Sequence, residues 1–336
     1  MYFAGLDAHL AYVAVAVVDK SGTLLLERRV PTRKPEELVA TLRTYAGIEA
    51  VVETCPCWPW IYDLLTAAGI PVHVAHAKEL RAIATSHRKT DERDATLLAR
   101  MLAAGLIPKI HPKARAQRDA ATLLRHRALL VRQRTAFANR VHAQLHQSRL
   151  TLRRGQLLRK ATRAWLRTDA WPRFSREQRR AVRGSLQLIT RLTRMIRALD
   201  RVIAVRAAAA PAVAVLNTIP GIGPYRGLLL ATELTPITRF PTPAHLASYA
   251  GLAPSTRRSA LRITHGPIPA GANRRVRGAL VAAIPSHVKF APTSSLSAYY
   301  SRLKARLGWP TARVATARRL AHVIYHMLHT GEMWRG

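Results

Sequence analysis

The sequence predicts a mixed α/β domain, a long helical arm and a mainly helical C-terminal domain. Residues 1–110 alternate short runs of β-branched residues with amphipathic segments, which is typical of strands and helices that follow one another. Residues 111–208 carry apolar residues at helical spacing among many arginines, and residues 209–336 contain helical segments separated by Gly and Pro. The expected fold class is therefore α/β plus α, with domain boundaries after residues 110 and 208.

The elements of the first part follow from hydrophobic periodicity. Two strands are expected within residues 2–19, separated near Ala8 and His9, because apolar residues alternate on both sides of this break. The other expected elements are a strand at 23–30, a helix at 34–47, a strand at 49–54, a helix at 58–69, a strand at 70–77, a short helix at 78–84 and a helix at 91–105 that Thr90 would cap. This order is that of an RNase H-like mixed sheet, in which the first and fourth strands are neighbours.

Two long helices are expected in the arm. Apolar residues recur at helical spacing in the first, and the second has one apolar stripe with steps of four and three residues beside another with steps of seven. The first helix carries Leu123, Leu130, Phe137, Val141 and Leu145; the second carries Leu188, Leu192, Met195, Leu199 and Val202 in one stripe and Ile189, Ile196 and Ile203 in the other. We expect these helices to pack antiparallel, either as an ordinary bundle or as a coiled coil that also dimerises.

The third part begins with a Gly- and Pro-rich turn between two apolar helical segments. The stretch IPGIGP, residues 219–224, matches a helix-hairpin-helix. Backbone amides at Gly221 and Gly223 could bind a phosphate there, because helix N-termini favour anions. A plain connector between two helices is the alternative. The tail, residues 311–334, is expected to be helical.

The charge of the chain is extreme. It has 54 Lys and Arg against 18 Asp and Glu, a formal net charge of +36 and a pI of about 11.7. Such a charge favours nucleic-acid partners, because their phosphates form a polyanion. A membrane surface is the rival partner, but no apolar run approaches the length of a membrane span and the N-terminus lacks the features of a signal peptide. We therefore expect a cytoplasmic, nucleoid-associated protein without membrane contact.

The acidic residues are concentrated in the first hundred residues, which hold twelve of the 18. Asp7 ends the first expected strand and Glu53 ends the fourth, and these strands are neighbours in such a sheet. Asp91 and Asp94 are three residues apart and so share one helix face, whereas Glu92 points elsewhere. Four oxygen ligands without His or Cys favour Mg²⁺ or Mn²⁺. The alternative is a solvated helix start, where acidic residues are common.

A second candidate for chemistry lies in a polar, basic loop. Two serines, Ser255 and Ser259, stand there among Arg257, Arg258 and Arg262. Guanidinium groups could stabilise a serine alkoxide and the phosphate that it attacks. A loop that only contacts phosphates is the alternative. The helix expected to begin near Asn273 carries two more candidate nucleic-acid contacts, Arg274 and Arg275.

Several short motifs occur together in the order found in one known family. They are GLDAH, VVET, KTDERDA, IPGIGP, RFPTPAHLASYAGLAPS and GANRRVR. The chain resembles a DEDD-type insertion-sequence transposase, the group that includes Piv-type invertases and bridge-RNA-guided recombinases, over nearly its whole length.

The resemblance implies a RuvC-like N-terminal domain whose four acids are Asp7, Glu53, Asp91 and Asp94, and a coiled-coil arm for assembly as a dimer or tetramer. It implies a C-terminal transposase domain whose serine nucleophile aligns with Ser259. Donor and target double-stranded DNA and a structured guide RNA would be the partners. The family usually has Gly after the nucleophile, where this chain has Ala260, so Ser255 is the second candidate.

Three functions are compatible with these features. The leading one is a recombinase that forms a serine–DNA phosphodiester with the help of Mg²⁺ or Mn²⁺ held by carboxylates. The second is a RuvC-like nuclease that cleaves DNA junctions with metal-activated water. The third is a nucleic-acid scaffold without catalysis, in which the acids are structural and no metal is needed.

Overall fold

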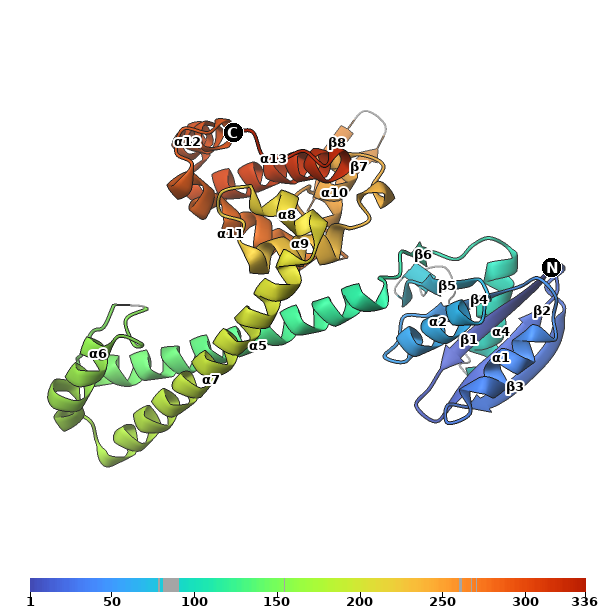
Figure 1. The fold of residues 1–336 in the computed structure, drawn as a ribbon, viewed down its shortest axis with the longest axis horizontal. Helices are drawn as coiled ribbons and strands as arrows, with labels where there is room; N and C mark the ends of the chain where they lie inside the picture. Colours follow the sequence, from blue (N-terminus) through green and yellow to red (C-terminus); the bar gives the residue numbers. More distant parts are fainter. Residues whose placement is uncertain (78, 81–90, 154, 260–261, 267, 270) are drawn as a thin grey trace. The chain divides into compact units, whose positions relative to one another are not determined.

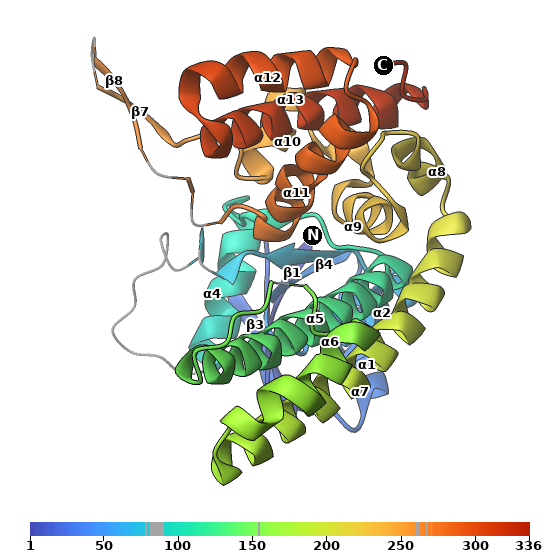
Figure 2. The same ribbon diagram turned by 90° about the vertical axis from the view of Figure 1, so that its left-hand side faces the viewer.

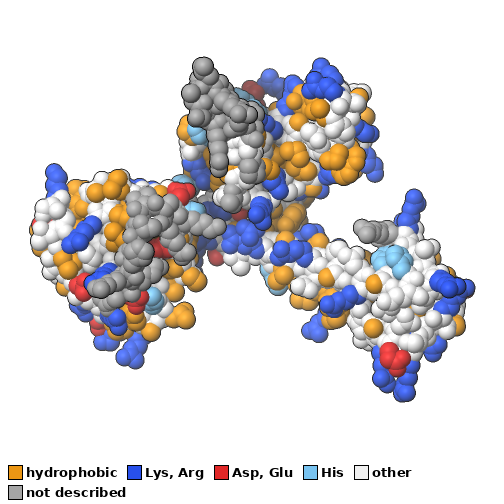
Figure 3. All heavy atoms as spheres, turned by 180° about the vertical axis from the view of Figure 1, so that it is seen from behind, with side chains coloured by type: hydrophobic (Ala, Val, Ile, Leu, Met, Phe, Trp, Pro, Cys, Tyr) orange, Lys and Arg blue, Asp and Glu red, His pale blue; other side chains and the backbone are white. Residues whose placement is uncertain are grey.

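A computed structural model describes the chain except for residues 78, 81–90, 154, 260–261, 267 and 270 (Figure 1). The chain divides into two compact units, Met1–Arg115 and Ala116–Gly336. Lys and Arg side chains are visible on both units in the face shown in Figure 3. Among the described residues, no helix has the length and apolar character needed to cross a membrane.

A six-stranded mixed sheet forms the framework of the first unit, with strand order β3-β2-β1-β4-β5-β6. Strands β1, β2 and β3 form an antiparallel meander, β4 and β5 run parallel to β1, and β6 is antiparallel to β5. The strand bounds are Tyr2–Ala8, Tyr12–Val18, Leu24–Pro31, Ile48–Glu53, Val72–Ala75 and Lys109–Ile110. The predicted mixed sheet and the contact between the first and fourth strands are confirmed, whereas β6 was not predicted.

Helices cover both faces of this sheet. Helices α1 (Pro35–Arg43) and α2 (Trp58–Ala67) pack on one face, where Leu38 and Ile61 join a buried cluster with Leu6. Helix α4 (Asp91–Ala103) packs on the other face, where its apolar residues meet those of β1, β2 and β4. The short helix predicted at 78–84 lies mostly outside the described residues. Thr90, the expected cap of α4, also lies outside them.

The absence of a side chain at Gly5 sets how closely α4 approaches the sheet. A Cβ built on Gly5 would lie 1.9 Å from the carbonyl oxygen of Ala95 and 2.6 Å from the backbone nitrogen of Ala99. Small side chains also lie at the contact between β2 and α4, where Ala14, Ala16 and Ala95 are buried together. This close packing holds the first turn of α4 beside the end of β1.

The second unit is mainly helical, as predicted. Figures 1 and 2 show α12 and α13 lying side by side, and the hairpin of β7 and β8 projecting from the helices. The helix bounds are α5 Arg115–Gln147, α6 Lys160–Trp165, α7 Arg176–Ala208, α8 Pro211–Asn217, α9 Pro224–Leu234, α10 Pro243–Tyr249, α11 Arg274–Phe290, α12 Ser295–Leu307 and α13 Trp309–Thr330, with shorter helical segments at Leu166–Ala170, Trp171–Arg173 and Ile237–Arg239. The segment corresponding to α12 was not predicted as a helix.

The long helices α5 and α7 pack antiparallel. Near one end of their contact, Arg127 Nε donates to Asp200 Oδ1 at 2.9 Å, and near the other the amide of Gln178 donates to that of Gln147 at 3.4 Å. The seven-residue stripe of α7, Ile189, Ile196 and Ile203, is buried. Three members of the other stripe are exposed, namely Leu188 at 41%, Met195 at 41% and Val202 at 47%. The isoleucine stripe therefore forms the buried seam.

A fully buried histidine joins three segments of the C-terminal helices. His287, in α11, is 0% exposed, and its Nδ1 lies 2.9 Å from the carbonyl oxygen of Pro220. Its Nε2 lies 2.8 Å from Ser294 Oγ, and Ser294 caps α12 by accepting from the backbone of Ser297. Burial lowers the pKa of His287 from its ordinary value of 6.5, because charging the ring would cost its hydration.

This burial predicts a loss of stability on acidification. The unfolded chain binds a proton at His287 more tightly than the folded chain, so unfolding takes up a proton and stability falls as the pH decreases below 6.5. The substitution His287→Gln is expected to destabilise the protein at pH 8. Below pH 6.5, the difference in unfolding free energy between wild type and the variant should narrow by at most about 1.4 kcal/mol per pH unit, because only wild type loses stability through His287. Denaturant titrations of both proteins between pH 8 and 5 test this; a difference that stays constant would contradict it.

Candidate active site

Two strands and one helix bring the predicted acids to one edge of the sheet. Asp7 is the next-to-last residue of β1 and Glu53 is the last residue of β4. The register pairs Leu6 with Val52, so Asp7 and Glu53 follow at adjacent positions. Because Phe3 and Val51 pack toward α4, the alternation of a strand places both acids on the α4 side of the sheet. Asp91 begins α4 and Asp94 follows within its first turn.

The closest contacts in this group involve a histidine. His9 Nε2 lies 3.0 Å from Asp7 Oδ2 and 3.4 Å from Asp91 Oδ1, and the Tyr12 hydroxyl donates to Asp91 Oδ2. One ligand atom from each of Asp7, His9 and Asp91 lies within 4.8 Å of the others. These side chains are only partly buried, so a substrate can reach them. The group has the donor types and spacing of a divalent-cation site.

The electrostatics of the group also fit a cation. Burial raises the pKa of the Asp7 carboxyl, and the negative charges of Asp91 and Asp94 raise it further, whereas the hydrogen bond and charge of His9 oppose the rise. Carboxylates held this close destabilise one another unless a positive charge lies between them. The residues present therefore suit a divalent metal ion, and hard oxygen ligands suit Mg²⁺ or Mn²⁺.

Sequence reasoning missed two members of the group. The structure brings Asp7 and Asp91 together and places Asp94 within electrostatic range of Asp7. The expected set contained no histidine, whereas in the structure His9 bridges two of the carboxylates. Its position two residues after Asp7 was the available signal, and Tyr12 gave none. The side chain of Glu92 lies outside the described part of the chain.

The predicted serine region forms a hairpin rather than a loop. Strands β7 (Thr256–Ser259) and β8 (Arg262–His265) pair antiparallel, with Ser259 opposite Arg262. The side chains of both strands, including Arg257 and Arg258, lie outside the described part, as does Ala260. The hairpin was missed because its segment has few apolar residues to reveal a period of two.

Ser255 lies at the base of this hairpin, four residues before Ser259. The backbone N–H of Gly266 donates to the Ser255 carbonyl at 2.7 Å. A Cβ built on Gly266 would lie 2.5 Å from Ser255 Oγ, so a larger residue there would require the Ser255 hydroxyl to move. Of the two candidate serines, Ser255 thus directly precedes β7 and Ser259 is its last residue.

The IPGIGP turn connects α8 to α9, and its two glycines differ in surroundings. Gly221 has a φ of +93°, and a Cβ on it would lie 2.7 Å from the backbone nitrogen of His287, so its packing against α11 already requires glycine. Gly223 is exposed and caps α9 with nothing within 4 Å of where a Cβ would be. Arg274 and Arg275 begin α11, whose cap is Asn273.

Comparisons with known families agree with the motif order. A transposase family model named for DEDD transposases of IS110 matches residues 4–149, and the model described as "Transposase IS116/IS110/IS902 family" matches residues 213–301. The two matches together span well over half of the chain. The chain belongs to the IS110 family of transposases.

Two curated relatives are similar to this transposase. The transposase for insertion sequence element IS1111A of Coxiella burnetii is 25% identical over 98% of this chain and 90% of its own length. The insertion element IS110 uncharacterized 43.6 kDa protein of Streptomyces coelicolor is 36% identical over 139 residues, which cover 41% of this chain and 34% of that protein. The match therefore spans about a third of the Streptomyces relative.

One solved structure resembles part of the transposase. RuvC of Thermus thermophilus in complex with a Holliday junction substrate matches 33% of this chain and 99% of its own, with 14% identity and a TM-score of 0.28. A likeness at this score supports no inference by itself. The strand order of the first unit, described above, is what carries the RNase H-like assignment.

Proposed function

We propose that this transposase cleaves and rejoins DNA strands at the ends of an insertion sequence, with Mg²⁺ or Mn²⁺ held by Asp7, Glu53, Asp91 and Asp94. The observation that carries this proposal is the gathering of Asp7, His9 and Asp91 within 4.8 Å in a chain that is poor in acids. The chain has three times as many Lys and Arg as Asp and Glu, so carboxylates gathered at one place differ from its otherwise basic composition.

Each residue of the centre has a role in phosphoryl transfer. Divalent cations bound there would stabilise the attacking and leaving oxygens of the phosphate. Asp7 and Glu53 supply carboxylates from neighbouring strands, and Asp91 and Asp94 supply them from α4. His9 holds Asp7 and Asp91 in a fixed geometry, and the hydroxyl of Tyr12 orients Asp91.

We further propose that Ser259 is the nucleophile, with Ser255 as the second candidate. Ser259 Oγ would lose its proton and attack the phosphorus, and the bond from phosphorus to the leaving sugar oxygen would break as that oxygen takes up a proton. The reverse attack by a sugar hydroxyl on the phosphoserine rejoins a strand, so no external energy source is needed. Arg257, Arg258 and Arg262 would bind the phosphate, as guanidinium groups do.

The partners in this proposal follow from the charge and from the family. Double-stranded donor and target DNA would be the substrates, and a structured guide RNA would select them by base pairing. Helices α5 and α7 would form a coiled coil that assembles a dimer or tetramer, and the turn before α9 would act as a helix-hairpin-helix on a phosphate. The protein would work on chromosomal DNA in the cytoplasm, associated with the nucleoid.

A covalent adduct tests the serine step. Labelled DNA with the element's ends, the flanking transcript and Mg²⁺ are incubated with wild type, Ser259→Ala and Ser255→Ala, and the products are separated under denaturing conditions. The expected result is a protein–DNA adduct in wild type and in Ser255→Ala, and its loss in Ser259→Ala. Loss in Ser255→Ala alone would move the nucleophile to the base of the hairpin.

A nuclease without a covalent intermediate is the second candidate function. It is favoured by the placement of the carboxylate group, which lies wholly within the compact first unit. In that case water would attack the phosphate in place of a serine. Metal-dependent cleavage without any adduct, unchanged in both serine variants, would be its signature.

A further inference from the structure

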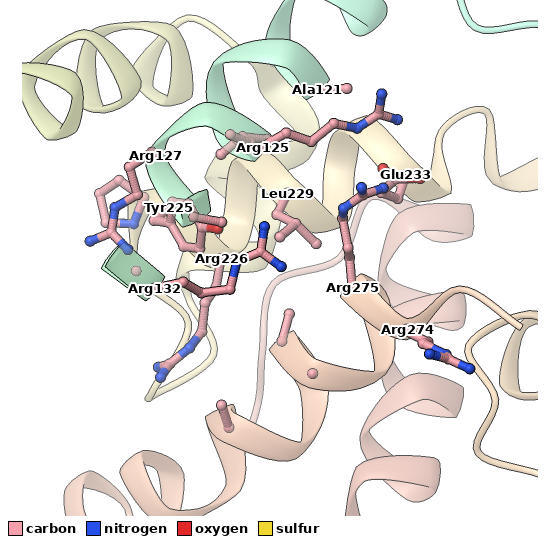
Figure 4. Close-up of a pocket in the computed structure, with 17 residues that line it drawn as sticks. Ala121, Arg125, Arg127, Arg132, Tyr225, Arg226, Leu229, Glu233, Arg274 and Arg275 are labelled. Atoms are coloured by element: carbon pink, nitrogen blue, oxygen red, sulfur yellow. The ribbon is translucent and has the colours of Figure 1, made fainter. Parts of the chain in front are cut away.

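A hollow with six arginines in its lining lies in the second unit, between α5, α9 and α11. Its volume is about 670 Å³ (Figure 4). Six arginines and one acid line it, together with small and apolar residues. The arginines are Arg125, Arg127, Arg132, Arg226, Arg274 and Arg275, and the acid is Glu233.

Two of these arginines serve the protein itself. Arg127 forms an ion pair with Asp200 at 2.9 Å, and its guanidinium lies 4.5 Å from the centre of the Tyr225 ring. Arg226 donates to the Gly221 carbonyl oxygen at 2.6 Å and so holds the turn before α9. The acid, Glu233, is 5% exposed and accepts a hydrogen bond from the Asn273 amide at 2.9 Å. These groups form a fixed frame for the hollow.

The other four arginines lack such a partner. Within the described part of the chain, the side chains of Arg125, Arg132, Arg274 and Arg275 make no ion pair or hydrogen bond, and all four are exposed. Figure 4 shows them on two different helices, Arg125 and Arg132 on α5 and Arg274 and Arg275 on α11. Like charges gathered around a hollow repel one another, and a bound anion removes that cost.

Several residues that line the hollow between the arginines have small side chains or none. Gly278 lies within the 17-residue helix α11, where glycine costs about 1 kcal/mol relative to alanine. A Cβ built on Gly278 would meet nothing within 4 Å, so packing does not require glycine there. The other small residues of the lining are Ala121, Ala128, Gly223, Ala279 and Ala282. Glycine at this position leaves the backbone of α11 open to the hollow.

We propose that this hollow binds the phosphodiester backbone of one nucleic-acid strand, a site separate from the carboxylate centre. The inference rests on the proposed function, because it names where that transposase holds nucleic acid. Guanidinium groups bind phosphate oxygens through paired hydrogen bonds, and the start of α9 at Gly223 adds a positive helix end. The volume suits a nucleotide or two rather than a double helix, so a single or unpaired strand is the expected ligand.

Filling the hollow without changing its charge tests this site. Gly278→Leu puts a large side chain into the hollow and should keep or raise the melting temperature, because leucine favours a helix more than glycine does. Binding of fluorescent single-stranded DNA and RNA oligonucleotides, followed by anisotropy in the full-length protein, is expected to weaken by about tenfold or more. The matched control is Gly184→Leu in α7, another helical glycine with open space around it, which should bind as wild type does.

A charge test separates this site from the basic surface in general. The double variant Arg132→Gln, Arg275→Gln should weaken single-strand binding more than Lys304→Gln, Arg306→Gln on α12, which removes the same charge elsewhere. Single-strand binding by Gly278→Leu equal to that of wild type, or equal weakening by the two double variants, would overturn the proposal. A loss confined to DNA or to RNA supports it and identifies which nucleic acid occupies the hollow.

The carboxylate centre is tested apart from this site. Strand cleavage in Mg²⁺ reports on the proposed function, whereas equilibrium binding in EDTA reports on the hollow. Weaker binding by Gly278→Leu, together with a wild type that does not cleave, would support the hollow and contradict the carboxylate centre. Cleavage by wild type with unchanged binding by Gly278→Leu would do the reverse.

Discussion

Asp7→Asn is expected to lower metal-dependent strand cleavage by at least about 10³-fold while leaving nucleic-acid binding intact. The substitution keeps the size of the side chain and removes the charge that a cation needs at the end of β1. Asp7 belongs to the group within 4.8 Å that also contains His9 and Asp91, so the substitution removes the charge of one of the two carboxylates in that group. Gel analysis of labelled DNA at a fixed Mg²⁺ concentration measures the loss.

The same variant should not be less stable than wild type in EDTA. Burial and two neighbouring carboxylates raise the pKa of Asp7, which means that its charge is unfavourable in the metal-free protein. Mg²⁺ should raise the melting temperature of wild type and not that of Asp7→Asn, because the ion stabilises only a folded protein that binds it. Glu36→Gln, an exposed acid at the start of α1, is the matched control and should behave as wild type. Full cleavage by Asp7→Asn would exclude Asp7 from the centre.

Gly5→Ala is expected to have the second large effect, although it adds a single methyl group. The new Cβ would lie 1.9 Å from the Ala95 carbonyl oxygen, which is backbone and cannot rotate away. Helix α4 must therefore move off the sheet, at a cost of more than about 2 kcal/mol. Asp91 and Asp94 move with it, so cleavage should fall together with stability. Denaturant unfolding and the cleavage assay measure the two effects.

The matched control for Gly5→Ala is Gly184→Ala, within α7. A Cβ at Gly184 meets nothing within 4 Å, so alanine should stabilise the protein by about 0.5–1 kcal/mol through helix propensity. Cleavage should not change. If Gly5→Ala were as stable as wild type and cleaved DNA equally well in Mg²⁺, the close approach of α4 would not be what positions Asp91.

The sequence was sufficient for the framework of the first unit because its signals are local. Alternating apolar residues identify β1 and β2, and strand order then follows from general rules for mixed sheets. The placement of Asp7 beside Glu53 follows from that order. The role of Gly5 does not, because it depends on contact with Ala95, ninety positions further along the chain.

Other features escaped prediction for physical reasons. His9 stands two residues after Asp7, but its contact with Asp91, which lies far away in sequence, follows from no local pattern. Two apolar stripes compete on α7, and only the partner helix decides that Ile196 is buried while Met195 is exposed. Strands β7 and β8 contain too few apolar residues to show a strand period, since they form a separate two-stranded hairpin.

The most direct test of the carboxylate centre is a titration of the full-length protein with Mn²⁺, in which electron paramagnetic resonance measures the free ion. The centre described here predicts saturable binding by wild type and by Glu36→Gln, and loss of that binding in Asp7→Asn and Asp91→Asn. Because the readout needs no DNA, RNA or catalysis, it isolates the site from its function. Equal binding by all four proteins, or no binding by wild type, would contradict the metal centre.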